Sequence, residues 1–134
     1  MQLKINKRAL GNYFESIALD RICNEPDQPS RRVIVLEKNY QTRYGEIDLI
    51  YEEIKENRYH GQAIKTLVFC EVRGRSSEAS HWDLEASIGP NKRRKIKNLA
   101  VYYLNSYLGS ATEVRFDVVI VDGEEIRLFE DAFQ

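Results

Sequence analysis

An amphipathic helix set between two apolar strands constrains this chain more than any other feature. Its apolar residues recur at steps of three and four, at Ile96, Leu99, Ala100, Tyr103, Leu104 and Tyr107. This spacing is typical of a helix with one buried face. Apolar runs at 67–73 and 114–121 predict a strand on either side of it. A helix between two such strands makes a right-handed crossover, which places them side by side and parallel.

Further elements follow from local patterns. Helical spacing of apolar residues and a cap at Asn6 predict a first helix from Asn6 to Cys23, and Asn91 and Gly109 are the expected cap and end of the second helix. β-Branched runs predict strands at 33–36 and 46–51, and the turn signal Asp122-Gly123 leads to a last strand at 126–129.

The order of elements defines the fold class. It reads helix, three strands, helix, two strands, and the short links between the first three strands favour antiparallel pairing. The long polar stretch at 52–66 predicts that the second and third strands extend into a protruding hairpin. We therefore expect one α/β domain over residues 1–134, with a mixed sheet and a helix on each face.

Composition excludes several classes of protein. The chain has 20 Lys and Arg against 21 Asp and Glu, and it is 43% hydrophobic, which is too apolar for a disordered chain. No apolar run approaches the ~18 residues of a membrane span, and the charged N-terminus does not resemble a signal peptide. Cys23 and Cys70 lie too far apart for a paired metal or redox motif. A reduced, cytoplasmic protein is the simplest expectation.

Acidic residues embedded in apolar strands are the candidates for chemistry. Alternation along a strand places Glu46 and Asp48 on one face, with Ile47 and Leu49 on the other. Glu71 and Arg73 share a face of the third strand, which leaves Cys70 facing the core. Taken singly, each motif also fits an ion pair or a solvated strand edge.

Taken together, the two strands predict a cation site. If they are neighbours, Asp48 and Glu71 converge across the pair, and two carboxylates that close repel unless a proton or a cation lies between them. Mg²⁺ takes oxygen ligands from one or two carboxylates and completes its shell with water and phosphate. Arg73 would face the same site. These are the minimum groups for metal-assisted hydrolysis of a phosphodiester.

Asp48 followed by Glu71-Val72-Arg73 resembles the PD-(D/E)xK signature of the restriction-endonuclease-like nucleases. The wider pattern resembles the YraN-like family of small bacterial proteins, which is itself similar to archaeal Holliday-junction resolvases. The matching pieces keep the family's order and are Gly11-x-x-x-Glu15-x-x-Ala18, Asn39 to Arg43, Gly45 to Ile50, Phe69-x-Glu71-Val72-Arg73-x-Arg75, Lys92, Arg115 to Val119, and Ala132-Phe133. The resemblance thus covers nearly the whole chain.

The resemblance implies a site for Mg²⁺ or Mn²⁺. Asp48 and Glu71 would be ligands, the Val72 carbonyl a third, and Glu15 would bind through water or orient one. Arg73 stands where the signature has lysine, and arginine can clamp a phosphate but stays protonated and cannot act as a base. Lys92 or Lys95 could instead bring an amine to the site.

A basic cluster supplies a second argument for a phosphate-bearing partner. Residues 91–98 hold five cations and no acid, and cations at a helix start oppose its macrodipole unless an anion binds there. The predicted contacts to nucleic acid are Arg75, Lys92, Arg93, Arg94 and Lys95. An ordinary solvated face is the alternative. From Arg73 to Lys97 there are seven basic and three acidic residues, so the net charge of −1 conceals a basic segment.

Three functions remain open at this point. The leading one, implied by the resemblance, is a metal-dependent endonuclease acting on DNA, including branched or structured forms, with Glu15, Asp48, Glu71 and Arg73 in the site. Since junction-cutting relatives are commonly dimers, a homodimer is one expectation. The second is a nucleic-acid-binding protein that keeps the fold without hydrolysis, which Arg73 favours. The third is a protein-interaction module whose acids are structural. Asp117 would be an accessory acid or pair with Arg115.

Overall fold

The computed structural model describes residues 7–24, 30–56, 61–75, 88–123 and 125–133. The elements are α1 (Lys7–Cys23), β1 (Arg31–Thr42), β2 (Gly45–Glu56), β3 (Ala63–Arg75), α3 (Pro90–Leu104), β4 (Glu113–Asp122) and β5 (Glu125–Phe129). This confirms the predicted order of helix, three strands, helix and two strands. The predicted cap at Asn6 lies outside the described residues.

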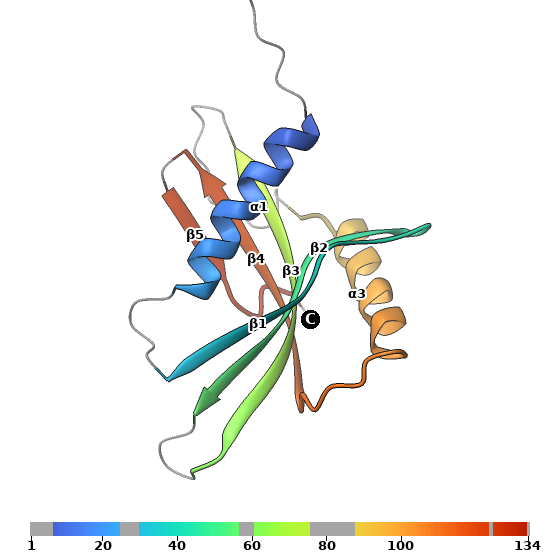
Figure 1. The fold of residues 1–134 in the computed structure, drawn as a ribbon. Coiled ribbons are helices and arrows are strands. Elements are labelled where there is room, and N and C mark those ends of the chain that lie inside the picture. The colour runs from blue at the N-terminus through green and yellow to red at the C-terminus, as the bar shows by residue number, and fades with distance from the viewer. Residues whose placement is uncertain (1–6, 25–29, 57–60, 76–87, 124, 134) are drawn as a thin grey trace, which may run out of the picture.

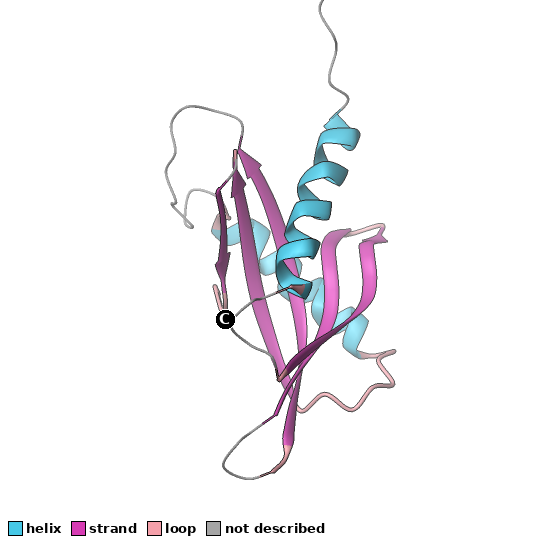
Figure 2. Ribbon diagram, turned by 60° about the vertical axis from the view of Figure 1, so that its left-hand side comes forward, coloured by secondary structure: helices cyan, strands magenta, loops and turns pink. Residues whose placement is uncertain are grey.

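The strands form one mixed sheet in the order β1-β2-β3-β4-β5. β3 and β4 pair in parallel across the α3 crossover, as predicted, while the other neighbours are antiparallel. β2 and β3 stay paired out to Glu56 and Ala63, which confirms the extended hairpin. The fold is therefore the expected α/β architecture, with a helix on each side of the sheet (Figures 1 and 2).

Two apolar clusters hold the helices on the sheet. Beneath α1 lie Ala18 and Ile22 together with buried residues of the strands, among them Cys70, which faces the core as predicted. Beneath α3 lie Ile96 and Leu99 with residues such as Phe69. Each helix buries most of the apolar face that its sequence spacing defines, and that burial fixes the helix on the sheet. The exception is Leu104, at the end of α3, which the spacing predicts to be buried but which is 37% exposed.

The ends of α3 differ from the prediction. Gly89 is the N-cap and Pro90 takes the first helical position, so the predicted cap, Asn91, lies inside the helix. The helix ends at Leu104, before Gly109. Tyr107 lies beyond that end, where it still packs against the core and donates a hydrogen bond from its hydroxyl to Glu52.

Strand β2 is irregular at Asp48. On the β1 side, Lys38 pairs with Leu49 and Tyr40 with Ile47, but the position between them is skipped. On the other side the ladder with β3 ends at Leu49. Because β2 departs from a regular strand here, Ile47 packs beneath α3 and Leu49 beneath α1. The prediction that these two side chains share a face is therefore wrong.

A buried ion cluster joins β1, β2 and β4. Arg115 donates from Nε and Nη2 to the Asp117 carboxylate, both at 2.8 Å, and from Nη1 to Glu53 at 2.9 Å. Arg31 binds the same Glu53 at 2.6 Å, and the Tyr51 hydroxyl donates to Asp117. Of the two roles considered for Asp117, the structure shows the pairing with Arg115.

Candidate active site

Asp48 lies where β2 leaves β3. Its Oδ2 accepts a hydrogen bond from the backbone N–H of Val72 at 2.8 Å. The ladder between the two strands ends at Leu49 and Cys70, one residue after Asp48 in β2 and two residues before Val72 in β3. The Asp48 side chain therefore accepts from an N–H that has no backbone partner in β2. The bond turns the carboxylate toward β3, where Glu71 precedes Val72.

Glu71 is the most buried acid of this site. It is 4% exposed, and no donor among the described residues hydrogen-bonds to its Oε2 atom. Its Oε1 atom lies 3.6 Å from Nζ of Lys92 and 3.8 Å from Nη2 of Arg73. The start of α3 and the strand β3 therefore bring two cations to one buried carboxylate.

Asp48 and Glu71 are neighbouring carboxyl groups whose pKa values are both raised by burial. Burial, and next the carboxylate of Asp48, raise the pKa of Glu71 to about 8, although Lys92 and Arg73 oppose that rise. Burial also raises the pKa of Asp48, against the hydrogen bond from Val72. The two carboxyl groups interact closely, and burial with mutual repulsion favours a proton on the pair when no cation is present.

Glu15 and Glu46 extend the acidic site on the other side of Asp48. One carboxylate oxygen from each of these three residues lies within 4.8 Å of the others. Burial, followed by the charge of Asp48, raises the pKa of Glu15, and a hydrogen bond from Asn39 opposes this. A cavity of about 240 Å³ opens here, lined by the three acids and by Arg8, Gly11, Asn12, Asn39 and Gln41.

Glu46, Asn39 and Gln41 also line the site, although the sequence prediction assigned none of them to it. The i, i+2 spacing of Glu46 and Asp48 was a usable signal, since it puts both on one face of β2. Asn39 has a φ of 52°, a left-handed conformation that asparagine tolerates, at the skipped position of the β1–β2 ladder. The Gln41 amide donates to Glu46 at 3.4 Å. Asn39 and Gln41 lie in the stretch Asn39 to Arg43 that matches the family pattern, but their positions along the strand do not by themselves point to the acidic site.

The predicted basic residues fall into separate places. Lys92 reaches Glu71, whereas Lys95 lines a different cavity beside Tyr44 and Tyr102. Arg93 donates to the Ile88 carbonyl at 3.0 Å and stacks over the ring of Phe133.

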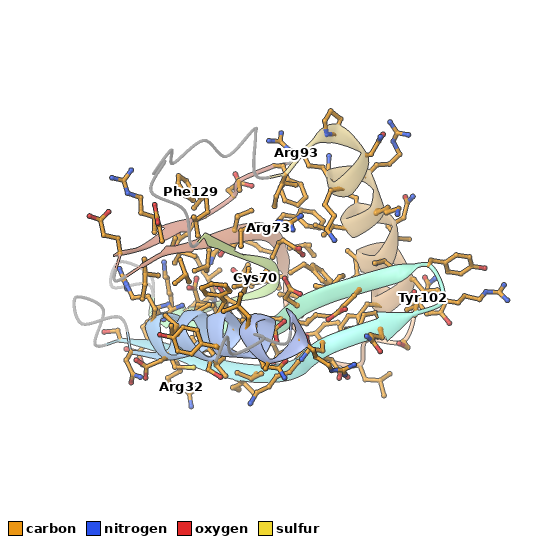
Figure 3. The ribbon with its side chains drawn as sticks, turned by 90° about the horizontal axis from the view of Figure 1, so that it is seen from above. Arg32, Cys70, Arg73, Arg93, Tyr102 and Phe129 are labelled. Atoms are coloured by element: carbon orange, nitrogen blue, oxygen red, sulfur yellow. The ribbon has the colours of Figure 1, made fainter. Side chains whose placement is uncertain are left out.

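The other two predicted contacts lie further from the acids. Arg94 is exposed on α3. Arg75 is the last residue of β3, and its side chain lies outside the described part of the chain. Of the two lysines considered as amine donors, it is Lys92 that contacts the acidic site. Figure 3 shows Arg73 near the centre of the molecule and Arg93 on the first turns of α3.

The donor set fits a hard divalent cation. All of its side-chain donors are carboxylate oxygens, which Mg²⁺ and Mn²⁺ prefer. Glu71 Oε2 is buried without a hydrogen-bond partner among the described residues, and burial raises the pKa values of Glu71 and Asp48, so ionising both carboxylates here is unfavourable without a further cation. A cation between Asp48 and Glu71 would bind the unpaired oxygen and would stabilise both carboxylates in their charged form.

Comparison with known proteins places the chain in a family. The model of the "Uncharacterised protein family UPF0102" matches residues 29–121. The chain belongs to the UPF0102 family. A UPF0102 protein of Lachnoclostridium phytofermentans is 42% identical over 130 residues, which are 96% of each chain. One of Dechloromonas aromatica is 37% identical over 134 residues, covering 99% of this chain and 97% of the relative. One of Thermodesulfovibrio yellowstonii is 33% identical over 124 residues, covering 92% and 95%.

UPF0102 is the YraN-like family that the sequence motifs resemble, a family of the PD-(D/E)xK-like nuclease type, so the predicted family is confirmed. The names of these relatives state the family and no activity. Among the helices that the structure describes, none is long and apolar enough to span a bilayer.

Proposed function

We propose that this UPF0102 protein is a Mg²⁺- or Mn²⁺-dependent phosphodiesterase that cleaves DNA. The observation that carries the proposal is the setting of Glu71, a buried carboxylate with an unpaired oxygen, between Asp48 and Lys92. An acid pair with a cation binding site on one side and an amine on the other is suited to a phosphate group.

Asp48 and Glu71 would hold the cation, with the Val72 carbonyl as a further ligand. Glu15 and Glu46 stand on the far side of Asp48, where they would bind or orient water. When bound, the cation would lower the pKa of a coordinated water and neutralise charge on the phosphate. The hydrogen bond from Val72 to Asp48 keeps that ligand oriented before any cation arrives.

Lys92 and Arg73 would position the phosphate. Both side chains are 37% exposed, and both reach Oε1 of Glu71, so their charged groups stand at the mouth of the buried pocket. Arg73 can bind a phosphate oxygen and stabilise charge that develops on it, but it does not exchange protons near neutral pH. Lys92 supplies the amine that the PD-(D/E)xK signature places at the position of Arg73.

A second candidate function is binding of nucleic acid without hydrolysis. Its support is Arg73 itself, since the signature has lysine at that position. The cations in the first turns of α3 would also bind phosphates in a protein that does not cleave DNA. Lys92 lies at the acidic site, and Lys95 lies in the cavity beside Tyr44 and Tyr102. The two candidates differ in whether Glu71 and a metal are needed.

Metal titration of the wild type and of Glu71→Gln tests the choice. Mn²⁺ binding is measured by calorimetry, and cleavage is measured on linear duplex, single-stranded and four-way-junction DNA. We expect the wild type to bind Mn²⁺ and cut at least one DNA, and the variant to lose both. Glu125→Gln, an exposed acid of β5, is the matched control and should retain both.

DNA binding that ignores metal, without cleavage, would establish the second candidate. Failure to bind both metal and DNA would leave the third, a protein-interaction module. The size of the wild type on DNA, measured by sedimentation, would show whether it acts as a homodimer.

A further inference from the structure

A groove lies between side chains of the β1–β2 hairpin tip and of α3, beside the point where the two elements touch. One cavity of about 290 Å³ is lined by Tyr44, Lys95, Asn98, Leu99 and Tyr102, and its walls are mainly apolar. A second, of about 560 Å³, continues along the hairpin from Tyr40 to Tyr44 and again reaches Tyr102. Figure 3 shows Tyr102 beside the hairpin tip. The two cavities share Tyr44 and Tyr102, so they form one groove.

The groove is already formed in the folded protein. Gly45, at the hairpin turn, has a φ of 149°, and a Cβ atom at this position would lie 3.3 Å from the Leu99 side chain. The turn therefore rests directly on α3. The Thr42 hydroxyl accepts a hydrogen bond from the Tyr44 backbone N–H at 3.0 Å, which fixes the turn from inside. Preformed walls reduce the entropy lost on binding.

Two tyrosine rings are exposed in this groove. Tyr44 is 61% exposed and Tyr102 is 58% exposed. The Arg43 guanidinium lies over the Tyr44 ring, 4.9 Å from its centroid, and donates to the Tyr44 hydroxyl at 2.6 Å. Arginine thus holds this ring in place while most of it remains in contact with solvent. Fixed, exposed rings beside cations are the groups on which nucleobases stack.

The groove adjoins the acidic site at Gln41. Gln41 lines both the cavity of Glu46 and Asp48 and the cavity of Tyr44 and Tyr102. Cations follow the same path, because Lys92 contacts Glu71 and Lys95, three residues further along α3, lines the groove. Arg43 lines the groove as well. A strand whose phosphate lies at Glu71 could follow these cations to the tyrosines.

We propose that this groove binds an unpaired nucleotide of a DNA strand, with its base stacked on Tyr44 or Tyr102 and its phosphates beside Lys95 and Arg43. The proposal rests on the proposed function for the position of the cut, and it adds a substrate class. A base inside a duplex is stacked on its neighbours and cannot reach the rings. The protein should therefore prefer DNA that has an unpaired nucleotide next to the cut, as single strands, flaps and open junctions have.

Binding to two labelled DNAs tests the groove independently of cleavage. The protein carrying Glu71→Gln is titrated into a labelled thymidine homopolymer and into a labelled blunt duplex of equal length, and binding is followed by fluorescence anisotropy. We expect tighter binding of the single strand, and we expect Tyr44→Ala or Tyr102→Ala to weaken it by about tenfold, the loss of one base stack. Binding of the duplex should change less than about twofold.

Matched variants separate stacking from folding. Tyr44→Phe and Tyr102→Phe keep a ring and should retain single-strand affinity. Tyr13→Ala removes a tyrosine of α1 that is 58% exposed, the same as Tyr102. This variant should bind single strands as tightly as the protein without this substitution. A thermal melt of each variant confirms that it folds. If both alanine variants bind single strands normally, or lose duplex and single strand alike, the groove is not a base-binding site.

Three further outcomes would also overturn the groove proposal. Absence of binding to either DNA overturns it. If the tyrosine variants instead change the sedimentation coefficient of the free protein, the groove is an interface between two copies of the chain. Failure of the nuclease proposal is seen separately, as a wild type that cuts no DNA while the preference for single strands persists. If the wild type cuts duplex and single strand equally well, only the groove proposal fails.

Discussion

The ammonium of Lys92, in the first turn of α3, lies 3.6 Å from Oε1 of Glu71 in β3. A cation in the first turn opposes the helix macrodipole, so α3 gains nothing from Lys92 at this position. Lys92 instead offsets the charge of a carboxylate that is buried beside a second carboxylate. The crossover that pairs β3 with β4 in parallel thus also delivers a cation to the acidic site.

Replacing Lys92 by alanine should abolish metal-dependent cleavage. The proposed role of its amine is to hold the phosphate, and loss of one such group costs about 100-fold in rate or more. Cleavage of the preferred DNA is measured under single-turnover conditions. Lys97→Ala, in the same helix, removes an equal charge and should cut at the wild-type rate. Retained activity in Lys92→Ala would exclude this lysine from the reaction.

Without metal, Glu71 should make the protein less stable as pH rises. Its pKa of about 8 in the folded state lies above its ordinary value of 4.5, so between these values the folded state keeps a proton that the unfolded state releases. Stability from this group is complete below pH 4.5 and is lost as pH rises toward 8. Glu71→Gln removes the effect.

Thermal melts in EDTA check this sign. The melting temperature of Glu71→Gln, minus that of the wild type, should increase between pH 5 and pH 8. Added Mg²⁺ should reverse the trend for the wild type alone, because metal competes with the proton. A difference that is constant across this range would show that Glu71 is ionised throughout in the folded protein.

The architecture was accessible from the sequence because each element carries its own local pattern. Helical spacing from Ile96 onward, between two apolar strands, was enough to specify the parallel pair and the crossover. The burial of Cys70 also follows from strand alternation. Such features depend on the spacing of apolar residues and on the order of helices and strands, and both can be read from the sequence. The pairing of Arg115 with Asp117 and the contact of Lys92 with Glu71 were each one of two alternatives that the sequence left open.

The details at Asp48 were not accessible in this way. Regular alternation predicts that Ile47 and Leu49 share a face, and it fails because β2 loses its regular pairing on both sides at Asp48. That irregularity arises from contacts between strands, including the bond from Val72. The positions of Asn39 and Gln41 depend on this irregularity. So does the shape of the cavity that Glu46 and Glu15 both line.

Arg115→Met should destabilise the fold strongly. It leaves Glu53 and Asp117 as buried carboxylates without their main partner, at a cost of about 3–5 kcal/mol. Burial raises the pKa of Glu53, but hydrogen bonds from Arg115 and Arg31 outweigh it and lower that pKa to about 2. Urea denaturation measures the loss, and Arg32→Met, an exposed position of β1, should cost less than about 0.5 kcal/mol.

The pairing of Arg115 with Glu53 also makes the stability of the fold depend on pH in the acidic range. Glu53 is held at a pKa of about 2, below its ordinary 4.5, so its contribution is complete above pH 4.5 and is lost as pH falls toward 2. The difference in unfolding free energy between wild type and Arg115→Met should therefore shrink over that range. A difference that does not change with pH would mean that the destabilisation comes from lost packing rather than charge.

Two glycine substitutions should shift stability in opposite directions. Gly45→Ala meets Leu99 at 3.3 Å and forces an L-residue to a φ of 149°, which should lower the unfolding free energy by about 1–3 kcal/mol. In Gly11→Ala the new methyl group meets nothing within 4 Å, and alanine should raise helix stability by up to about 1 kcal/mol. Urea denaturation of both variants measures the two shifts. Equal effects would mean that the hairpin turn yields easily, and the tyrosine groove would then not be a rigid, preformed site.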